Sequence, residues 1–131
     1  MNILELISEA YKAKEYSYSP YSNFHVGAAL CTDSGRIYRG CNIENAAYTP
    51  TNCAERTAFF KAVSEGVRDF QAICIVGGKD GVLTEYAAPC GVCRQVMMEF
   101  CNPKTFQIIL AIDKERYDIY KIGRAHVRTP V

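Results

Sequence analysis

The sequence predicts an α/β domain with three layers, in which helices cover both faces of a central mixed sheet of about five strands. Residues 72–78 and 106–112 are continuous apolar runs, which are typical of strands buried on both faces. Residues 53–63 and 90–100 alternate with those runs along the chain and combine helix-forming residues with one apolar side. Residues 26–41 are expected to form a hairpin, which adds antiparallel strands to the sheet.

The chain is expected to begin with an amphipathic helix over residues 3–14, because apolar side chains recur there at helical spacing. Residues 17–23 are rich in Ser, Tyr, Pro and Asn, which end that helix. Strands over residues 26–31 and 36–41 flank the short polar turn 32–35. These two strands are therefore expected to pair as antiparallel neighbours.

The remaining elements follow in the same way. Residues 42–52 form an irregular segment that leads into the helix 53–63. After the first buried strand, a loop is expected over residues 79–89, followed by the helix 90–100 and the last buried strand. Because no internal repeat or interdomain linker interrupts this order, we expect one domain over residues 1–120.

The composition is that of an ordinary globular protein. The 131 residues include 15 Lys and Arg against 14 Asp and Glu, which gives a net charge of +1, and 49% are apolar. This balance argues against a non-specific nucleic-acid binder, which carries a clear basic excess. No apolar run approaches the roughly 20 residues that span a bilayer, and the N-terminus lacks a signal peptide's basic region. We therefore expect a cytoplasmic protein that binds neither nucleic acid nor membrane.

Seven cysteines give the first chemical signal, since an odd number cannot pair completely and disulfides are rare in a reducing compartment. Cys90 and Cys93 have ligand-type spacing at the start of a predicted helix, where free N–H groups favour thiolates. Alone, the pair fits a redox site, half of a structural zinc site or part of a catalytic site. The cysteines expected only to pack are Cys31, Cys41, Cys74 and Cys101.

Cys53 and Glu55 narrow these alternatives. They open the other predicted helix after an irregular loop, and helix N-termini at one edge of a sheet can meet. Three thiolates and one water form an open, catalytic zinc site, whereas a structural site has a fourth protein ligand. A carboxylate beside that water is placed to act as a general acid and base.

These motifs carry a family resemblance. The run Cys53-Ala54-Glu55 with Pro89-Cys90-Gly91-Val92-Cys93 resembles the signature of the zinc nucleobase deaminases. Residues 18–30 and 40–48 are similar to the homotetrameric cytidine deaminases of the cytidine and deoxycytidylate deaminase family. The resemblance covers roughly residues 1–120 and implies the cytidine deaminase fold, a homotetramer with shared active sites, and a role in pyrimidine salvage.

The resemblance also implies a mechanism. Cys53, Cys90 and Cys93 would hold one Zn²⁺ per chain, and zinc-bound hydroxide would attack C4 of cytidine or 2′-deoxycytidine. Glu55 would carry protons from the water to ring atom N3 and to the departing amine. The expected products are uridine or 2′-deoxyuridine and ammonia.

Other positions match the family's substrate-binding residues. Asn42 and Glu44 would bind the ribose, and Phe24 would pack on the pyrimidine face. The backbone around Ala54 would read the amide edge of the base.

A second group of residues would act on the metal site. Three thiolates leave a zinc cluster with a net negative charge, which makes its bound water less acidic. Arg56 would offset this charge through hydrogen bonds to the thiolates, and Gln95 is a weaker candidate for the same task.

Two alternatives remain open. One is a deaminase of a modified cytosine nucleoside such as blasticidin S, although the run Asn42-Ile43-Glu44 favours a plain ribose. The other is a non-catalytic, zinc-stabilised nucleoside-binding protein. Residues 121–131 leave room for this second alternative, because they lack the family's aromatic C-terminal end and are expected to be an atypical tail, truncated or non-native.

Overall fold

The computed structural model describes residues 1–79 and 91–122 of the chain. The expected loop 79–89 therefore lies almost wholly outside the described residues, as do Cys90 and most of the atypical tail. The described elements are, in order, α1 (Ile3–Lys14), β1 (Phe24–Thr32), β2 (Ile37–Cys41), α2 (Ala54–Ser64), β3 (Phe70–Lys79), α3 (Gly91–Phe100), β4 (Gln107–Ala111) and β5 (Tyr117–Tyr120).

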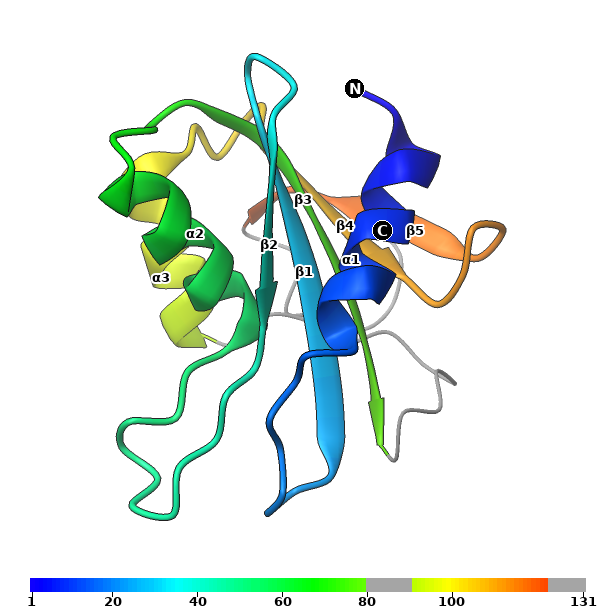
Figure 1. The fold of residues 1–131 in the computed structure, drawn as a ribbon. Helices are drawn as coiled ribbons and strands as arrows, with labels where there is room; N and C mark the ends of the chain where they lie inside the picture. Colours follow the sequence, from blue (N-terminus) through cyan, green and yellow to red (C-terminus); the bar gives the residue numbers. More distant parts are fainter. Residues whose placement is uncertain (80–90, 123–131) are drawn as a thin grey trace.

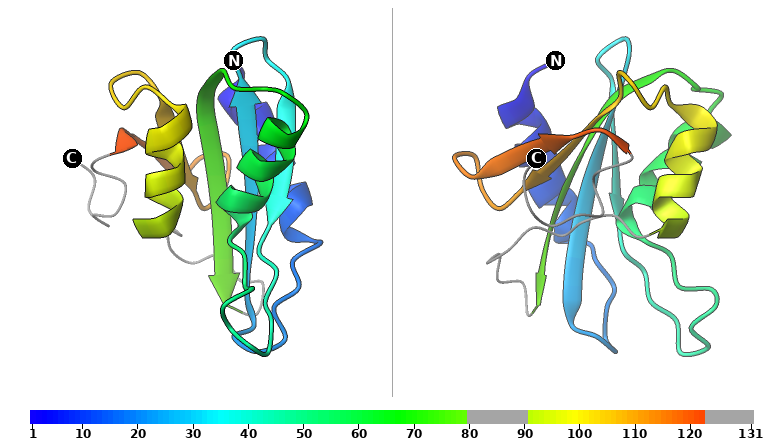
Figure 2. Two further views of the ribbon diagram at one scale, coloured as in Figure 1. Left: turned by 90° about the vertical axis from the view of Figure 1, so that its left-hand side faces the viewer. Right: turned by 180° about the vertical axis from the view of Figure 1, so that it is seen from behind.

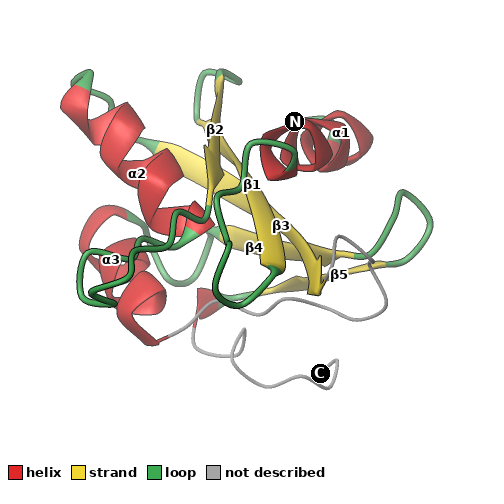
Figure 3. Ribbon diagram, turned by 60° about the horizontal axis from the view of Figure 1, so that its bottom comes forward, coloured by secondary structure: helices red, strands yellow, loops and turns green. Residues whose placement is uncertain are grey.

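The five strands form one mixed sheet in the order β2-β1-β3-β4-β5. β1 pairs antiparallel with both β2 and β3, β3 pairs parallel with β4, and β4 pairs antiparallel with β5. The helix α1 covers one face of this sheet, and α2 and α3 cover the other (Figures 1 and 3). The predicted three-layer α/β class with a mixed sheet is confirmed.

Each face of the sheet has its own apolar core. Along β3, Ile73 and Ile75 point into the core beneath α2 and α3, whereas Cys74 and Val76 point into the core beneath α1. Successive side chains of a strand point to opposite faces, so a continuous apolar run serves both cores. The view from behind shows β3 running through the middle of the sheet between the helices (Figure 2).

Three contacts hold the helix α2 in place against the sheet and against α3. The ring of Phe59 packs edge-on against Phe70, at 5.1 Å between centroids, and stacks on Phe100 of α3 at 6.4 Å. Gly40 of β2 allows the start of α2 to lie directly on the sheet, because a Cβ there would lie 2.3 Å from the carbonyl oxygen of Ala54. The N-terminus of α2 is thereby held against β2, and its middle is held against β3 and α3.

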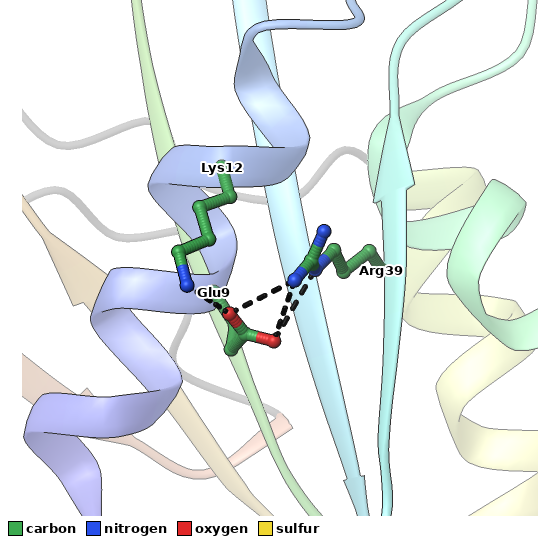
Figure 4. Close-up of polar contacts among 3 residues, drawn as sticks. All are labelled: Glu9, Lys12 and Arg39. Carbon is green, nitrogen blue, oxygen red and sulfur yellow. Dashed lines mark hydrogen bonds and ion pairs between the residues drawn. The ribbon is translucent and has the colours of Figure 1, made fainter.

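Strand β2 forms one edge of the sheet and is tied to a helix on each side. Arg39 of β2 and Lys12 of α1 both bind the carboxylate of Glu9, at 2.9 and 3.2 Å (Figure 4). On the other side, Nζ of Lys61 in α2 donates to the backbone carbonyl of Arg39 at 2.5 Å. Both helices therefore contact the edge strand through charged side chains.

The element predictions are close to the structure, with one omission. Strand β5 was not predicted as an element, because its four residues include Asp118 and lack an apolar run. It is nevertheless paired to β4 through the whole of its length. Ile122, which belongs to the predicted tail, is 2% exposed and packs in the core beneath α2 and α3. None of the described helices is long and apolar enough to cross a membrane.

Candidate active site

Cys53 is the N-cap residue of α2, with extended backbone angles of φ −78° and ψ 156°. This position places its side chain beside the unpaired N–H groups and the positive end of the helix dipole, which stabilise a thiolate. The next two residues, Ala54 and Glu55, are already helical and buried. The short run Cys53-Ala54-Glu55 therefore directs a thiol and a carboxyl group to the same helix end.

The carboxyl group of Glu55 is the most perturbed acid in the site. Glu55 is only 5% exposed, and burial, with the adjacent Cys53 thiol as a second cause, raises its pKa to about 7. A hydrogen bond with the side chain of Cys93 acts in the opposite direction and lowers that pKa. A carboxyl group kept out of water next to two thiols is typical of a group that transfers protons.

Cys93 brings the second helix into the site. It lies in the first turn of α3, is 1% exposed, and contacts both Glu55 and Arg56. Both helices begin toward the same end of the sheet (Figure 1). The structure therefore brings Cys53, Glu55 and Cys93 together, as expected, while the third expected ligand, Cys90, lies outside the described residues.

Arg56 supplies a positive charge to the thiols. Its Nη2 donates to Sγ of Cys53 at 3.3 Å, and this hydrogen bond is the largest cause that raises the pKa of Arg56. Its Nε is buried and has no hydrogen-bond partner within the described part of the chain. A further anionic group at this point would satisfy that donor.

The donor set fits zinc. Two thiols, a cation that binds one of them and a buried carboxyl group that is not needed as a ligand are the components of a thiolate-rich catalytic zinc site. Within residues 1–79 and 91–122, no group of three or more His, Cys, Asp and Glu side chains is arranged to hold a metal ion. The third expected ligand, Cys90, lies outside these residues.

Asn42 and Glu44 both face the segment that leads into β1. The side-chain amide of Asn42 donates to the carbonyl oxygen of Phe24 at 2.7 Å and accepts from the N–H of Val26 at 3.0 Å. Glu44 accepts from the N–H groups of Tyr21 and Ser22 and from the Ser22 hydroxyl.

These contacts orient the two proposed sugar-binding side chains. The Ser22 hydrogen bonds are the main cause that holds the pKa of Glu44 below its usual value, so this group is ionised at neutral pH. An ionised carboxylate is an acceptor that suits a sugar hydroxyl.

The other expected site residues differ in their placement. Phe24 is half-buried at the start of β1 and packs against the core beneath α2 and α3. Ala54 is fully buried at the first position of α2. Gln95 is exposed, since it follows Cys93 by two residues and points to a different side of α3.

Two hydroxyl groups at the site, those of Ser22 and Thr57, were not among the predicted site residues. Ser22 binds Glu44, and Thr57 joins α2 to the carbonyl oxygen of Cys41 at 3.0 Å. No local sequence pattern distinguishes these two hydroxyl residues. Ser22 is one of several polar residues in the turn-rich segment 17–23, and Thr57 lies four residues after Cys53.

A thiol and a carboxyl group at one helix N-terminus, met by a second helix that carries another thiol, are typical of the zinc-dependent hydrolases. Comparison with known families identifies which one. The family described as "Cytidine and deoxycytidylate deaminase zinc-binding region" matches residues 1–109, and the chain belongs to this family.

Similar proteins and structures agree with this assignment. The chain is 59% identical over 102 residues to a cytidine deaminase of Sporosarcina psychrophila, covering 78% of this chain and 72% of the relative. It is 55% identical over 100 residues to a cytidine deaminase of Halalkalibacterium halodurans, covering 76% and 73%. Its fold matches the crystal structure of cytidine deaminase from Burkholderia pseudomallei with a TM-score of 0.86 and 44% identity, over 95% of this chain and 96% of that chain.

Proposed function

We propose that this chain is a cytidine deaminase, which hydrolyses cytidine and 2′-deoxycytidine to uridine and 2′-deoxyuridine with release of ammonia. The observation that carries the proposal is the buried carboxyl group of Glu55, which lies between the thiols of Cys53 and Cys93. The relatives that share 55–59% identity support the choice of substrate, since both are cytidine deaminases.

Cys53, Cys90 and Cys93 would hold the zinc ion of this family. When bound, zinc acts as a Lewis acid that lowers the pKa of a water molecule towards neutrality. Arg56 donates to the Cys53 thiol and so reduces the negative charge that three thiolates accumulate.

Glu55 then moves the protons of the reaction. Its carboxylate takes a proton from the attacking water and passes it to N3 of the pyrimidine. The second proton of the same water is transferred to the exocyclic amine, so that the C4–N bond breaks and ammonia leaves. Burial keeps bulk water away from Glu55 during these transfers.

The remaining residues bind the nucleoside. Asn42 and Glu44 receive the sugar hydroxyls, and the half-buried ring of Phe24 packs on the face of the base. The backbone of Ala54 hydrogen-bonds the polar edge of the pyrimidine. Arg56 serves the metal site, whereas the side chain of Gln95 is exposed.

The proposal includes a homotetramer in the cytoplasm. Tyr21 and Tyr48 are 62% and 84% exposed and border, with Glu44, a cavity of about 250 Å³. Exposed aromatic rings beside a binding residue support a site that a neighbouring subunit completes. Buried thiols that form no disulfide, such as Cys74 and Cys101, fit a reducing compartment.

Size-exclusion chromatography with light scattering measures the mass of the assembly in solution. A mass of four chains of 14.6 kDa is expected, and an active monomer would contradict the shared sites.

Loss of ultraviolet absorbance on conversion of cytidine tests the reaction. We expect turnover by the purified protein, one zinc per chain, and a fall in kcat of about 10²–10⁴-fold for Glu55→Ala with unchanged zinc content. One zinc per chain without turnover of cytidine would instead favour a nucleoside-binding protein. Turnover of blasticidin S but not of cytidine would favour the modified nucleoside.

A further inference from the structure

Thr57 lies between the two parts of the site that the proposed reaction uses together. These parts are the sugar-binding segment 42–44 and the start of α2, which carries Glu55. Its hydroxyl oxygen lies 3.0 Å from the carbonyl oxygen of Cys41, the last residue of β2, and 3.1 Å from that of Cys53. The same oxygen accepts a hydrogen bond from Nδ2 of Asn52 at 3.2 Å. One side chain of α2 therefore contacts both the residue before Asn42 and the residue before Cys53.

The segment 42–44 is attached to the same connection from its other side. Ile43, which lies between Asn42 and Glu44, exchanges two backbone hydrogen bonds with Asn52, at 2.9 and 2.8 Å. The side chain of Asn52 in turn reaches Thr57. Thr57 is thus linked to the sugar-binding segment through Cys41 at its start and through Asn52 at its middle.

Helix formation does not account for a threonine at this position. The N–H of Thr57 already donates to the Cys53 carbonyl at 3.0 Å, which completes the helical hydrogen bond without the side chain. A β-branched residue lowers helix propensity compared with alanine. The hydroxyl, by contrast, spans 16 residues of sequence to reach Cys41.

We propose that Thr57 is a positioning residue, whose hydroxyl sets the distance between the sugar-binding segment 42–44 and Glu55 on α2. This inference rests on the proposed function and adds a determinant of substrate selectivity to it. The base reacts beside Glu55 while the sugar is held by Asn42 and Glu44. Binding of the sugar therefore places the base correctly beside Glu55 only when the segment 42–44 and α2 keep their spacing.

Removal of the Thr57 hydroxyl should affect only substrates whose sugar carries hydroxyl groups that reach segment 42–44. Loss of the Thr57 hydroxyl should weaken the reaction of cytidine, which presents hydroxyls to segment 42–44. It should have little effect on 2′,3′-dideoxycytidine, which lacks them. A variant that is only less stable loses active protein equally for both substrates, and the ratio of their kcat/KM values stays the same.

The experiment compares Thr57→Val, which keeps the shape of the side chain, with Thr57→Ser, which keeps the hydroxyl. For Thr57→Val we expect kcat/KM for cytidine to fall about 5- to 10-fold, as for loss of one hydrogen bond, with a change below about 2-fold for 2′,3′-dideoxycytidine and unchanged zinc content. Thr57→Ser should retain the wild-type ratio. Ser64→Ala removes a hydroxyl that donates to the Lys61 carbonyl oxygen within the same helix, and serves as the matched control.

Each outcome decides the question. An unchanged cytidine to dideoxycytidine ratio in Thr57→Val, or an equal change in Ser64→Ala, overturns the positioning role and leaves the proposed function intact. A wild-type protein that deaminates neither nucleoside overturns the proposed function itself. If Thr57→Val does not fold, Thr57→Ala takes its place, because alanine favours the helix and also lacks the hydroxyl.

Discussion

The surroundings of each sulfur, rather than burial alone, distinguish the cysteines, since Cys93 is 1% exposed but contacts Glu55 and Arg56. Cys74 is fully buried among apolar side chains, and this burial raises its pKa to about 12; burial also raises the pKa of Cys101 to about 12. Cys53 is half-buried and hydrogen-bonded to a guanidinium group. The expected division between packing thiols and reactive thiols is thus based on the surroundings of each sulfur.

A labelling experiment tests this division. At pH 8, we expect a disulfide reagent to leave Cys74 and Cys101 of the folded protein unmodified, because both thiols stay protonated about four units below their pKa, and Cys74 is fully buried while Cys101 is only 9% exposed. After unfolding in guanidinium chloride, both should react. Mass spectrometry of the labelled peptides gives the result, and rapid labelling of Cys74 in the folded state would contradict it.

At the scale of single residues, the sequence predicts a role best when the partner is close along the chain. Glu55 and Cys53 meet because they share one helix turn, so their meeting could be inferred from the motif alone. The contact of Thr57 with Cys41 depends on how α2 lies on β2, which no local pattern encodes. Gln95 illustrates the converse, since its neighbour Cys93 faces the core while Gln95 faces solvent.

At the scale of elements, the close approach of α2 to β2 should be sensitive to one methyl group. In Gly40→Ala the new Cβ would lie 2.3 Å from the Ala54 carbonyl oxygen and 2.6 Å from the N–H nitrogen of Ala58, so the helix must shift. We expect a loss of stability of about 1–3 kcal/mol in urea denaturation, together with reduced activity, because the N-terminus of α2 moves.

Gly35→Ala is the control for this variant. Gly35 has a positive φ of 92° in the turn between β1 and β2, and a Cβ there meets nothing within 4 Å. Only backbone strain of about 1 kcal/mol is expected, without loss of activity. Equal effects of the two substitutions on activity would show that the helix contact is not what matters.

The ion pair between α1 and β2 predicts a pH dependence of stability. Hydrogen bonding to Arg39 lowers the pKa of Glu9 below 4.5, so the folded state favours the carboxylate. The contribution is therefore present at neutral pH and is lost as the pH falls below about 4.5 through the pKa of the folded state. Because Glu9 and Arg39 keep 19% and 41% of their side-chain surface exposed, the gain is about 0.5–1 kcal/mol.

Urea denaturation of wild type, Glu9→Gln, Arg39→Gln and the double variant at pH 7 and pH 3 measures this coupling. A coupling energy that is the same at both pH values would rule out ionised Glu9 as its source.

Element prediction depended on how strong each apolar pattern is. The runs that form β3 and β4 were evident, because strands buried on both faces need apolar side chains at every position. Strand β5 is short and lies at the edge, so its register with β4 rather than its composition determines its structure. The ends of helices were predicted within one residue.

At the scale of the whole molecule, the alternation of strands and helices predicted the three layers. It did not predict which side chains fill the core on each face of the sheet. The core beneath α1 combines aliphatic side chains such as Leu6 and Ile7 with several alanines, whereas that beneath α2 and α3 contains the rings of Phe59 and Phe106. The order of the strands places β1 between β2 and β3. That order arises from pairing between distant parts of the chain.

The contact of Lys61 with the edge strand β2 has a consequence for the behaviour of the protein at high concentration. An edge strand presents unpaired backbone groups to which a strand of another molecule can add. On β2, the ammonium group of Lys61 already occupies the Arg39 carbonyl, and an incoming strand would have to displace it and desolvate its charge. The Lys61 side chain, which joins α2 to β2, thereby also disfavours aggregation through the edge of β2.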